Sequence, residues 1–336
     1  MKYNIAVVGA TGNVGRETLK ILAERNFPVD EIHAIASPSS LGKKLSFGED
    51  KIIAVEALGD FDFRGIDIVF SSAGSKISKQ FVKRAVEDGA IVIDKTSLYR
   101  MENDVPLVVP EVNGAEIAKF KKSKIISNPN CVAIPIATVL KPLDNVATVK
   151  RVVASTYQST SGAGRNGMDE LYEQTKSKYS YQNSSVSSFE RQIAFNVIPK
   201  IDNFEANGST MEESKIANEV RKILGSHIRI TTTCVRVPVF IGHSISLNVE
   251  FNNEMSAEKA YEILSGTKGI ITLSQNSKAK YTTPLEVVGK DEVFVSRIRV
   301  DESQKNTINM WVVVDNLRKG AALNAVQIAE ELIKHI

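Results

Sequence analysis

The stretch that decides the fold is Gly9-Ala10-Thr11-Gly12-Asn13-Val14-Gly15, near the N-terminus. It follows the apolar run Ile5–Val8, which is typical of a strand buried on both faces, and leads into an amphipathic helical pattern from Val14 to Arg25. Glycines at such a junction allow a tight turn and let a pyrophosphate approach the backbone at the helix N-terminus. The stretch therefore predicts a dinucleotide site, although its G-x-x-G-x-x-G spacing varies the usual pattern and a purely structural turn is the alternative.

Strand and helix patterns alternate through the rest of the first third. Strands are expected at Glu31–Ala36, Ile66–Ser71, Ala90–Asp94 and Lys124–Ser127, and a helix at Lys76–Glu87. This alternation predicts an α/β fold, a Rossmann-type doubly wound parallel sheet.

The middle of the chain has a different pattern, with longer β-rich runs separated by helical ones. It predicts an α+β domain with a mixed sheet. The β-rich runs are Thr148–Tyr157, His227–Phe251, Val293–Val300 and Thr307–Val314, and the helical ones are Arg165–Ser177 and Thr210–Leu224.

The last segment, Leu317–Ile336, is amphipathic and helical, after a polar opening from Asn316 to Gly320 that we expect to be flexible. A terminal helix of this kind can return to the first domain. We therefore expect a discontinuous nucleotide-binding domain of residues 1–130 plus 315–336, and a second domain of residues 131–314.

Composition excludes several classes of protein. A net charge of +3 over 336 residues is small, and the basic residues are interspersed with acidic ones, so no nucleic-acid partner is expected. No apolar stretch is long enough to span a bilayer, and no metal site is expected. Two cysteines, Cys131 and Cys234, cannot form a disulfide framework, which favours the reducing cytoplasm.

The loop after the second expected strand, Ala36–Lys43, bears on the choice of cofactor. NAD enzymes usually place a carboxylate there to bind the ribose 2′-hydroxyl, and this loop has none. Its hydroxyl groups and Lys43 suit a 2′-phosphate, so the loop favours NADP. A plain surface loop would explain the same residues.

Cys131 lies after a short strand and before the apolar helical run Val132–Leu140. A helix N-terminus favours the thiolate form, which is the nucleophile. We expect Asn130 to cap this helix, and its amide could also steady an oxyanion. A buried structural cysteine is the alternative, and Cys234, within an expected strand, is interpreted as such.

A thiolate mechanism also needs a proton donor and acceptor, and the chain has four histidines. His243 follows Gly242, where a strand could break near a site. His33 lies within a strand pattern, His227 in a loop and His335 at the chain end. His243 is therefore the candidate, with a structural histidine as the alternative.

Five motifs occur in order along the chain, and together they resemble the bacterial aspartate-semialdehyde dehydrogenases nearly end to end. The motifs are Ser127–Cys131 (SNPNC), Tyr157–Gly164 (YQSTSGAG), Cys234–Val239 (CVRVPV), Gly242–Ser244 (GHS) and Asp315–Ala325 (DNLRKGAALNA). The resemblance implies NADPH-dependent reduction of L-aspartyl-4-phosphate to L-aspartate 4-semialdehyde. This reaction belongs to the pathway to lysine and diaminopimelate, threonine and methionine. It also implies a homodimer formed through the second domain.

The resemblance assigns roles by position. Cys131 would attack the acyl phosphate and form a thioester, with His243 as acid/base and Asn130 beside the cysteine. The expected substrate contacts are Gln158, Arg236 for the α-carboxylate, Glu212 for the amine, and Arg100 with Lys215 for the phosphate. Without the resemblance, Glu212 and Lys215 would be interpreted as a surface ion pair on one helix face, and Arg100 as a solvated loop cation.

The cofactor contacts are assigned in the same way, and one position departs from the family. The family commonly has arginine where this chain has Ser39, so a cation is missing unless Lys43 replaces it. The expected contacts are Gly9, Thr11, Gly12, Asn13, Val14, Ser37, Ser39, Ser40, Ser161, Gly162 and Asn316.

Related chemistries remain as alternatives. N-acetyl-glutamyl-phosphate reductases usually place proline and glycine before the cysteine, and the Ser-Cys-Thr-Thr-Asn-Cys site of glyceraldehyde-3-phosphate dehydrogenases is absent. An acyl-CoA reductase, for example of malonyl-CoA, is a further alternative. A catalytically silent dinucleotide-binding sensor comes from a different class, and the combination of Cys131, Gln158, Arg236 and His243 argues against it.

Overall fold

The computed structural model describes residues 1–49, 51–180, 185–274 and 279–336. The chain divides into two compact units, Met1–Asn130 with Ala321–Ile336, and Cys131–Gly320. The chain thus leaves the second unit at Gly320, a few residues after the expected return at residue 315. No helix in the described ranges is both long and apolar enough to cross a membrane.

Within its described residues, the first unit is built on a seven-stranded sheet of order β3-β4-β2-β1-β5-β6-β7. All neighbouring strands pair in parallel except β3 and β4, which form an antiparallel edge that the sequence pattern did not predict. The strands are β1 (Tyr3–Val8), β2 (Val29–Ala36), β3 (Lys44–Phe47), β4 (Lys51–Ala57), β5 (Ile68–Ser71), β6 (Ile91–Asp94) and β7 (Ile125–Ser127).

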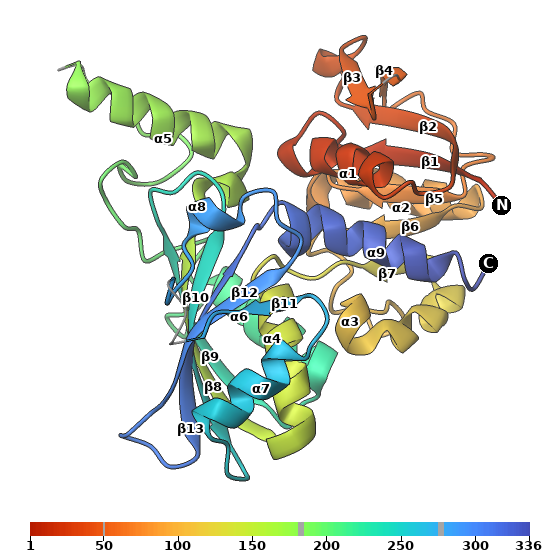
Figure 1. Cartoon of the computed structure of the whole chain (residues 1–336). Helices are drawn as coiled ribbons and strands as arrows, with labels where there is room; N and C mark the ends of the chain where they lie inside the picture. The colour runs from red at the N-terminus through yellow and green to blue at the C-terminus, as the bar shows by residue number, and fades with distance from the viewer. Residues whose placement is uncertain (50, 181–184, 275–278) are drawn as a thin grey trace. The chain divides into compact units, whose positions relative to one another are not determined.

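Helices cover both faces of this sheet, as the doubly wound prediction requires. α1 (Asn13–Glu24) and the C-terminal α9 (Leu323–Leu332) pack into one apolar cluster, and α2 (Ser75–Glu87) packs into the other. Figure 1 shows α9, in blue, beside α1, in red, although they come from opposite ends of the chain. A bidentate hydrogen bond from Arg25 to Glu330, at 2.7 and 2.8 Å, ties the ends of these helices together. The predicted fold class is confirmed.

The described part of the second unit has a six-stranded sheet of order β11-β12-β13-β10-β8-β9. The pairs β8–β9 and β11–β12 are parallel and the others antiparallel, so the sheet is mixed, as expected. The run His227–Phe251 forms two strands, because the chain turns through Pro238 and through Gly242, which has a φ of 97°. The strands are β8 (Val149–Gln158), β9 (Arg229–Arg236), β10 (His243–Phe251), β11 (Ile270–Thr272), β12 (Val293–Val300) and β13 (Thr307–Val314).

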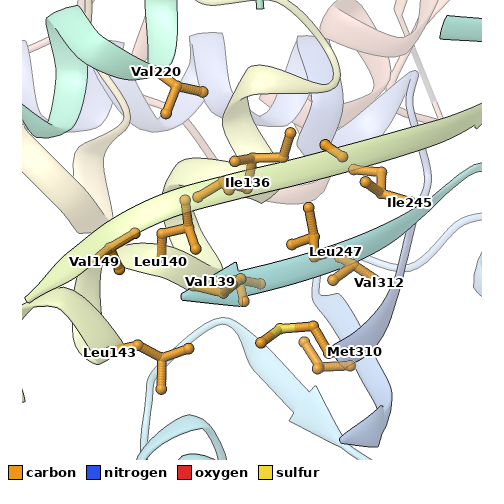
Figure 2. Packing of buried hydrophobic residues seen from close by; sticks show 14 of the residues in the cluster. Ile136, Val139, Leu140, Leu143, Val149, Val220, Ile245, Leu247, Met310 and Val312 are labelled. Carbon is orange, nitrogen blue, oxygen red and sulfur yellow. The ribbon is translucent and has the colours of Figure 1, made fainter. Parts of the chain in front are cut away.

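One face of this sheet is buried by α4 (Ala133–Ala147), α6 (Met211–Leu224) and α7 (Ala257–Ser265). Figure 2 shows Leu140 and Val139 of α4 packed against strand side chains such as Leu247 and Val312, all fully buried. Truncating a leucine in such a core typically costs about 2–5 kcal/mol. This core anchors the helix that follows Cys131.

The segment from Asn316 to Gly320 is not the flexible opening that its polar sequence suggested. Asn316, Arg318 and Lys319 are all buried, and a π-helical turn spans Arg318–Ala322. The expectation was wrong because these polar groups have protein partners. Arg318 Nε, for example, donates to Asp291 at 2.7 Å.

Candidate active site

Three of the expected site residues lie at the ends of adjacent strands in the second unit. Gln158 ends β8, Arg236 ends β9, and these two residues are opposite one another in the parallel pair. His243 begins β10, which runs antiparallel to β8. The carboxyl ends of two parallel strands and the amino end of an antiparallel neighbour meet at one sheet edge, so strand geometry brings the three side chains together.

The Sγ atom of Cys131 lies 3.4 Å from Nε2 of His243. Cys131 is half-buried and stands two residues before α4, which begins at Ala133. Its place at a helix N-terminus is as expected. The expected cap by Asn130 is wrong, because Val132 occupies the N-cap position and no side chain caps the helix.

The hydrogen bonds of His243 fix its tautomer. The backbone N–H of Ser159 donates to Nδ1 at 3.1 Å. A neutral histidine that accepts at Nδ1 carries its proton on Nε2, and this nitrogen faces Cys131. Burial, assisted by the charge of Arg236, lowers the pKa of His243 from 6.5 to about 3, so the ring is neutral at physiological pH.

A buried amide holds the loop around this histidine. Oδ1 of Asn316 accepts hydrogen bonds from Ser159 Oγ at 3.1 Å, Ser161 Oγ at 3.2 Å and the Gly242 backbone N–H at 2.9 Å. It therefore links the segment after β8 to the residue before His243. Asn316 and Ser161 were expected as cofactor contacts, and here their side chains bind each other.

Arg236, Gln158 and Glu212 form a connected polar group beside the histidine. Nη1 of Arg236 donates to the carbonyl oxygen of Ser159 at 2.7 Å, and burial lowers the pKa of this guanidinium. Gln158 Nε2 donates to Glu212 Oε1 at 3.2 Å, and the charge of Glu212 opposes the effect of burial on Arg236. A buried carboxylate thus lies near a buried cation, which suits the recognition of a zwitterionic ligand.

Gly162 allows Arg236 and His243 to lie close to the backbone. A Cβ atom there would lie 2.9 Å from Nη1 of Arg236 and 3.4 Å from Nε2 of His243. The absence of a side chain at position 162 therefore lets the guanidinium and the imidazole take these positions.

A cavity of about 280 Å³ in the same unit reaches Arg236 and is lined also by Phe189, Lys200, Asp202 and Asn203. Lys215 forms an ion pair with Asp202 at 2.5 Å, so its interpretation as a surface partner of Glu212 is wrong. No sequence pattern predicts this cavity, because much of its lining comes from a segment without regular periodicity.

Arg100 lies in the first unit and is not a solvated cation. It is buried, and its Nε donates to the carbonyl oxygen of Asn128 at 3.1 Å. The alternative interpretation is therefore wrong, since a protein carbonyl replaces water around this guanidinium.

The first unit contains a cavity of about 570 Å³ at the glycine stretch. Gly9, Thr11 and Gly12 line it, and α1 begins at Asn13, immediately after them. A Cβ at Gly15 would lie 2.2 Å from the carbonyl oxygen of Gly9, so only glycine allows the helix to pack here. The cradle and the helix N-terminus fit the pyrophosphate of a dinucleotide.

Comparison with known proteins identifies the family. A model described as the NAD-binding domain of semialdehyde dehydrogenases matches residues 4–120, and one described as their dimerisation domain matches residues 140–319. An aspartate-semialdehyde dehydrogenase of Rickettsia bellii is 58% identical over 99% of this chain and 98% of its own length. The chain belongs to the aspartate-semialdehyde dehydrogenase family.

Solved structures of the family agree. The structure of aspartate semialdehyde dehydrogenase II from Vibrio cholerae, complexed with ASA, has a TM-score of 0.97 and 44% identity, covering 99% of both chains. The enzyme from Candida albicans with NADP has a TM-score of 0.76 and 27% identity, covering 100% of this chain and 99% of its own. The expected oxidoreductase class and NADP as the family's cofactor are confirmed, and the sensor and other reductases are not favoured.

Ser39 is exposed and shares a hydrogen bond of 2.9 Å with Ser37. Ser37 lines the cavity. Ser40 is buried and accepts from Lys43 Nζ at 3.3 Å, so this lysine is directed back at its own loop.

The remaining cysteine and histidines lie outside this arrangement. Cys234 is fully buried and burial raises the pKa of its thiol, as suits a core residue. His33 contacts Glu56, and His227 contacts Asp144. In the described ranges, no group of histidine, cysteine and carboxylate side chains could hold a metal ion.

Proposed function

We propose that this chain reduces L-aspartyl-4-phosphate to L-aspartate 4-semialdehyde with NADPH, through a thioester on Cys131, in the pathway to lysine and diaminopimelate, threonine and methionine. The observation that carries the proposal is the 3.4 Å approach of Cys131 Sγ to Nε2 of a neutral, buried His243. The choice of substrate is supported by relatives that match nearly the whole chain and are named aspartate-semialdehyde dehydrogenases.

Cys131 attacks the acyl carbon as a thiolate, and the C–O bond to phosphate breaks as the C–S bond forms. The Nε2–H of His243 points at the sulfur and donates to the thiolate, which stabilises the nucleophile before attack. The same sulfur is the leaving group when the aldehyde forms, so this hydrogen bond assists both steps. Bound NADPH supplies the hydride that reduces the thioester carbonyl.

The proton on Nε2 makes His243 a hydrogen-bond donor to the reacting groups. Reduction of the thioester carbonyl produces an oxyanion on the carbon attached to Cys131, and the Nε2–H of His243 stabilises this charge. The oxyanion collapses to the aldehyde as the C–S bond breaks and Cys131 leaves as the thiolate, so the neutral ring neither loses nor gains a proton. The Ser159 N–H at Nδ1 keeps the ring oriented during this step.

Each charged group of the substrate is assigned a protein side chain of opposite charge. Arg236 binds the α-carboxylate, because its planar fork has N–H groups beyond the one bonded to Ser159. Glu212 binds the α-amine, and Gln158, bonded to Glu212, orients the acyl group. Arg100 and Lys215 bind the phosphate, and Asn130, next to Cys131 in the chain, borders the oxyanion.

The cofactor would be held by the glycine stretch and the loop after β2 in the first unit, with Ser161, Gly162 and Asn316 of the second. Gly9, Thr11, Gly12 and Ser37 already line one cavity, which supports this assignment. Asn13 and Val14 are the first residues of α1, where backbone N–H groups would face the pyrophosphate.

We further propose a homodimer formed through the second unit, since residues 140–319 match a dimerisation domain. The sheet face opposite α4 supports it, because Tyr157 and Trp311 pair there, at 5.3 Å between ring centroids, and Tyr157 remains exposed. The cytoplasm suits a biosynthetic enzyme whose two cysteines are free thiols.

The test is an assay of phosphate-dependent NADP reduction with L-aspartate 4-semialdehyde, run beside N-acetyl-glutamate semialdehyde and malonate semialdehyde with CoA. We expect activity with the first aldehyde and a requirement for phosphate. Activity only with N-acetyl-glutamate semialdehyde, or only with malonate semialdehyde and CoA, would show that the proposed substrate is wrong. NADP binding without turnover of any aldehyde would indicate a dinucleotide-binding sensor.

A further inference from the structure

The loop after β2, residues 37–43, has Lys43 as its one cation. The loop's own cation, Lys43, donates to Ser40 and does not line the nucleotide cavity. A second cation, Arg84 on α2, does line this cavity, together with Ser37 and Pro38 of the loop. Arg84 is more than 40 residues from this loop along the chain, so no local pattern connects the two.

Backbone contacts hold Arg84 close to that loop. Nη2 of Arg84 donates to the carbonyl oxygen of Leu58 at 3.0 Å, and Nη1 donates to that of Gly59 at 3.3 Å. The N–H of Leu58 in turn donates to the carbonyl oxygen of Ala36 at 3.2 Å. Ala36 directly precedes Ser37, so a short chain of hydrogen bonds connects the guanidinium to the residue at the expected 2′ position.

An aromatic ring also orients the guanidinium of Arg84. Its guanidinium carbon lies 5.3 Å from the centroid of the Phe63 ring. Such stacking orients an arginine and leaves its N–H groups available as hydrogen-bond donors. The head is therefore positioned at the wall of the cavity before any ligand binds.

The charge of Arg84 is not neutralised within the protein. Among the described residues no carboxylate lies within ion-pair distance of it, and Asp62, which feels its charge, is itself bonded to Arg64 at 2.9 Å. The two carbonyl oxygens leave several N–H groups of the guanidinium for a ligand. An exposed cation with spare donors on a nucleotide cavity suits a phosphate.

We propose that Arg84 binds the 2′-phosphate of NADP and supplies the positive charge that residues 37–42 of the loop lack. The inference rests on the proposed cofactor site. It makes Arg84 a specificity-determining residue: the 2′-phosphate lies between Ser37 on one wall and Arg84 on the other, and NADH makes no equivalent contact.

The test is a fluorescence titration of NADPH and NADH binding to the full chain, so it does not depend on turnover. Arg84→Met removes the charge and keeps the length of the side chain. We expect it to weaken NADPH binding by about tenfold and NADH binding by no more than about twofold. Arg84→Lys should retain an intermediate NADPH affinity, since it keeps the charge but not the fork.

Three further proteins sharpen the result. Lys43→Met removes the competing cation, and Lys79→Met removes an exposed lysine of α2 that does not line the cavity. Both should bind NADPH as the parent chain does. Adding Ser39→Arg to Arg84→Met should restore the preference for NADPH.

Two outcomes would overturn the inference. Equal weakening of NADPH and NADH binding by Arg84→Met would mean that the side chain supports the adenine or the fold. A loss of preference in Lys43→Met, with Arg84→Met unaffected, would assign the role to Lys43. The parent chain is titrated with both cofactors before any variant. If it binds NADPH and NADH equally, the proposed NADP site fails together with the role of Arg84.

Discussion

The backbone N–H of Ser159 donates to Nδ1 of His243 at 3.1 Å, so the main chain sets the tautomer of the histidine beside Cys131. A side-chain substitution at position 159 cannot remove this donor. Together with complete burial, it keeps His243 neutral with its proton directed at Sγ of Cys131.

The first prediction is that His243 makes the protein less stable in acid. Its pKa is about 3 in the folded chain against 6.5 ordinarily, so below pH 6.5 the unfolded chain binds a proton that the folded chain refuses. Stability therefore falls as the pH falls, by about 2 kcal/mol between pH 7 and pH 5 from this group alone. Urea unfolding of the parent chain and of His243→Asn should show a smaller fall in the variant. Equal falls would mean that His243 is not buried as a neutral ring.

A methyl group at Gly162 should displace the guanidinium of Arg236. The added Cβ would meet Nη1 of Arg236 at 2.9 Å and Nε2 of His243 at 3.4 Å. Gly162→Ala should lower kcat/KM by roughly tenfold to a hundredfold, because the two side chains lose their alignment. The control is Gly266→Ala, whose Cβ would find its nearest neighbours at 3.7 Å. Full activity of Gly162→Ala would show that the position of the Arg236 guanidinium does not limit the reaction.

Replacement of Arg236 by lysine keeps the charge and loses the planar fork. We expect kcat/KM for the aldehyde to fall by more than about tenfold, because a single ammonium cannot keep the bond to Ser159 and also bind a carboxylate bidentately. Arg229→Lys, an exposed position on the same strand, is the matched control and should stay within about twofold. Similar losses in both variants would point to strand stability instead of carboxylate binding.

Lys215 and Asp202 allow a reciprocal test of phosphate binding. Lys215→Ala should raise the KM for phosphate in the reverse direction by about tenfold, whereas Asp202→Asn should leave it unchanged or lower it by freeing the ammonium group. If the pair only stabilises the fold, both variants should lower the melting temperature alike and neither should change the phosphate KM.

The sequence predicted those parts of the molecule that local patterns encode. The glycine stretch and the apolar run before it identified the first sheet and its cavity, and Gly15 shows why, since no other residue fits against Gly9. The segment around Asn316 was misjudged, because its burial depends on partners such as Ser159, more than 150 residues away in the chain.

Local sequence context identified part of the candidate site but not how its residues come together. Cys131 and His243 were candidates from local context, yet only the packing of α4 against the sheet that contains β10 brings them within 3.4 Å. Arg84 was not predictable, because its relation to Ser37 arises through Leu58 and Ala36 on a neighbouring strand and loop.

The central claim is that Cys131 carries the acyl group, and a single-turnover experiment tests it most directly. The protein is mixed with L-aspartate 4-semialdehyde and NADP without phosphate, NADPH formation is followed, and the chain is digested for mass spectrometry. We predict a burst of about one NADPH per active site, with an aspartyl group bound to the peptide containing Cys131, and release of that group when phosphate is added. Cys131→Ala should bind NADP normally and give no burst, whereas Cys234→Ala should retain it. A burst in Cys131→Ala, or phosphate-dependent turnover of the parent chain without any acyl group on Cys131, would contradict the account.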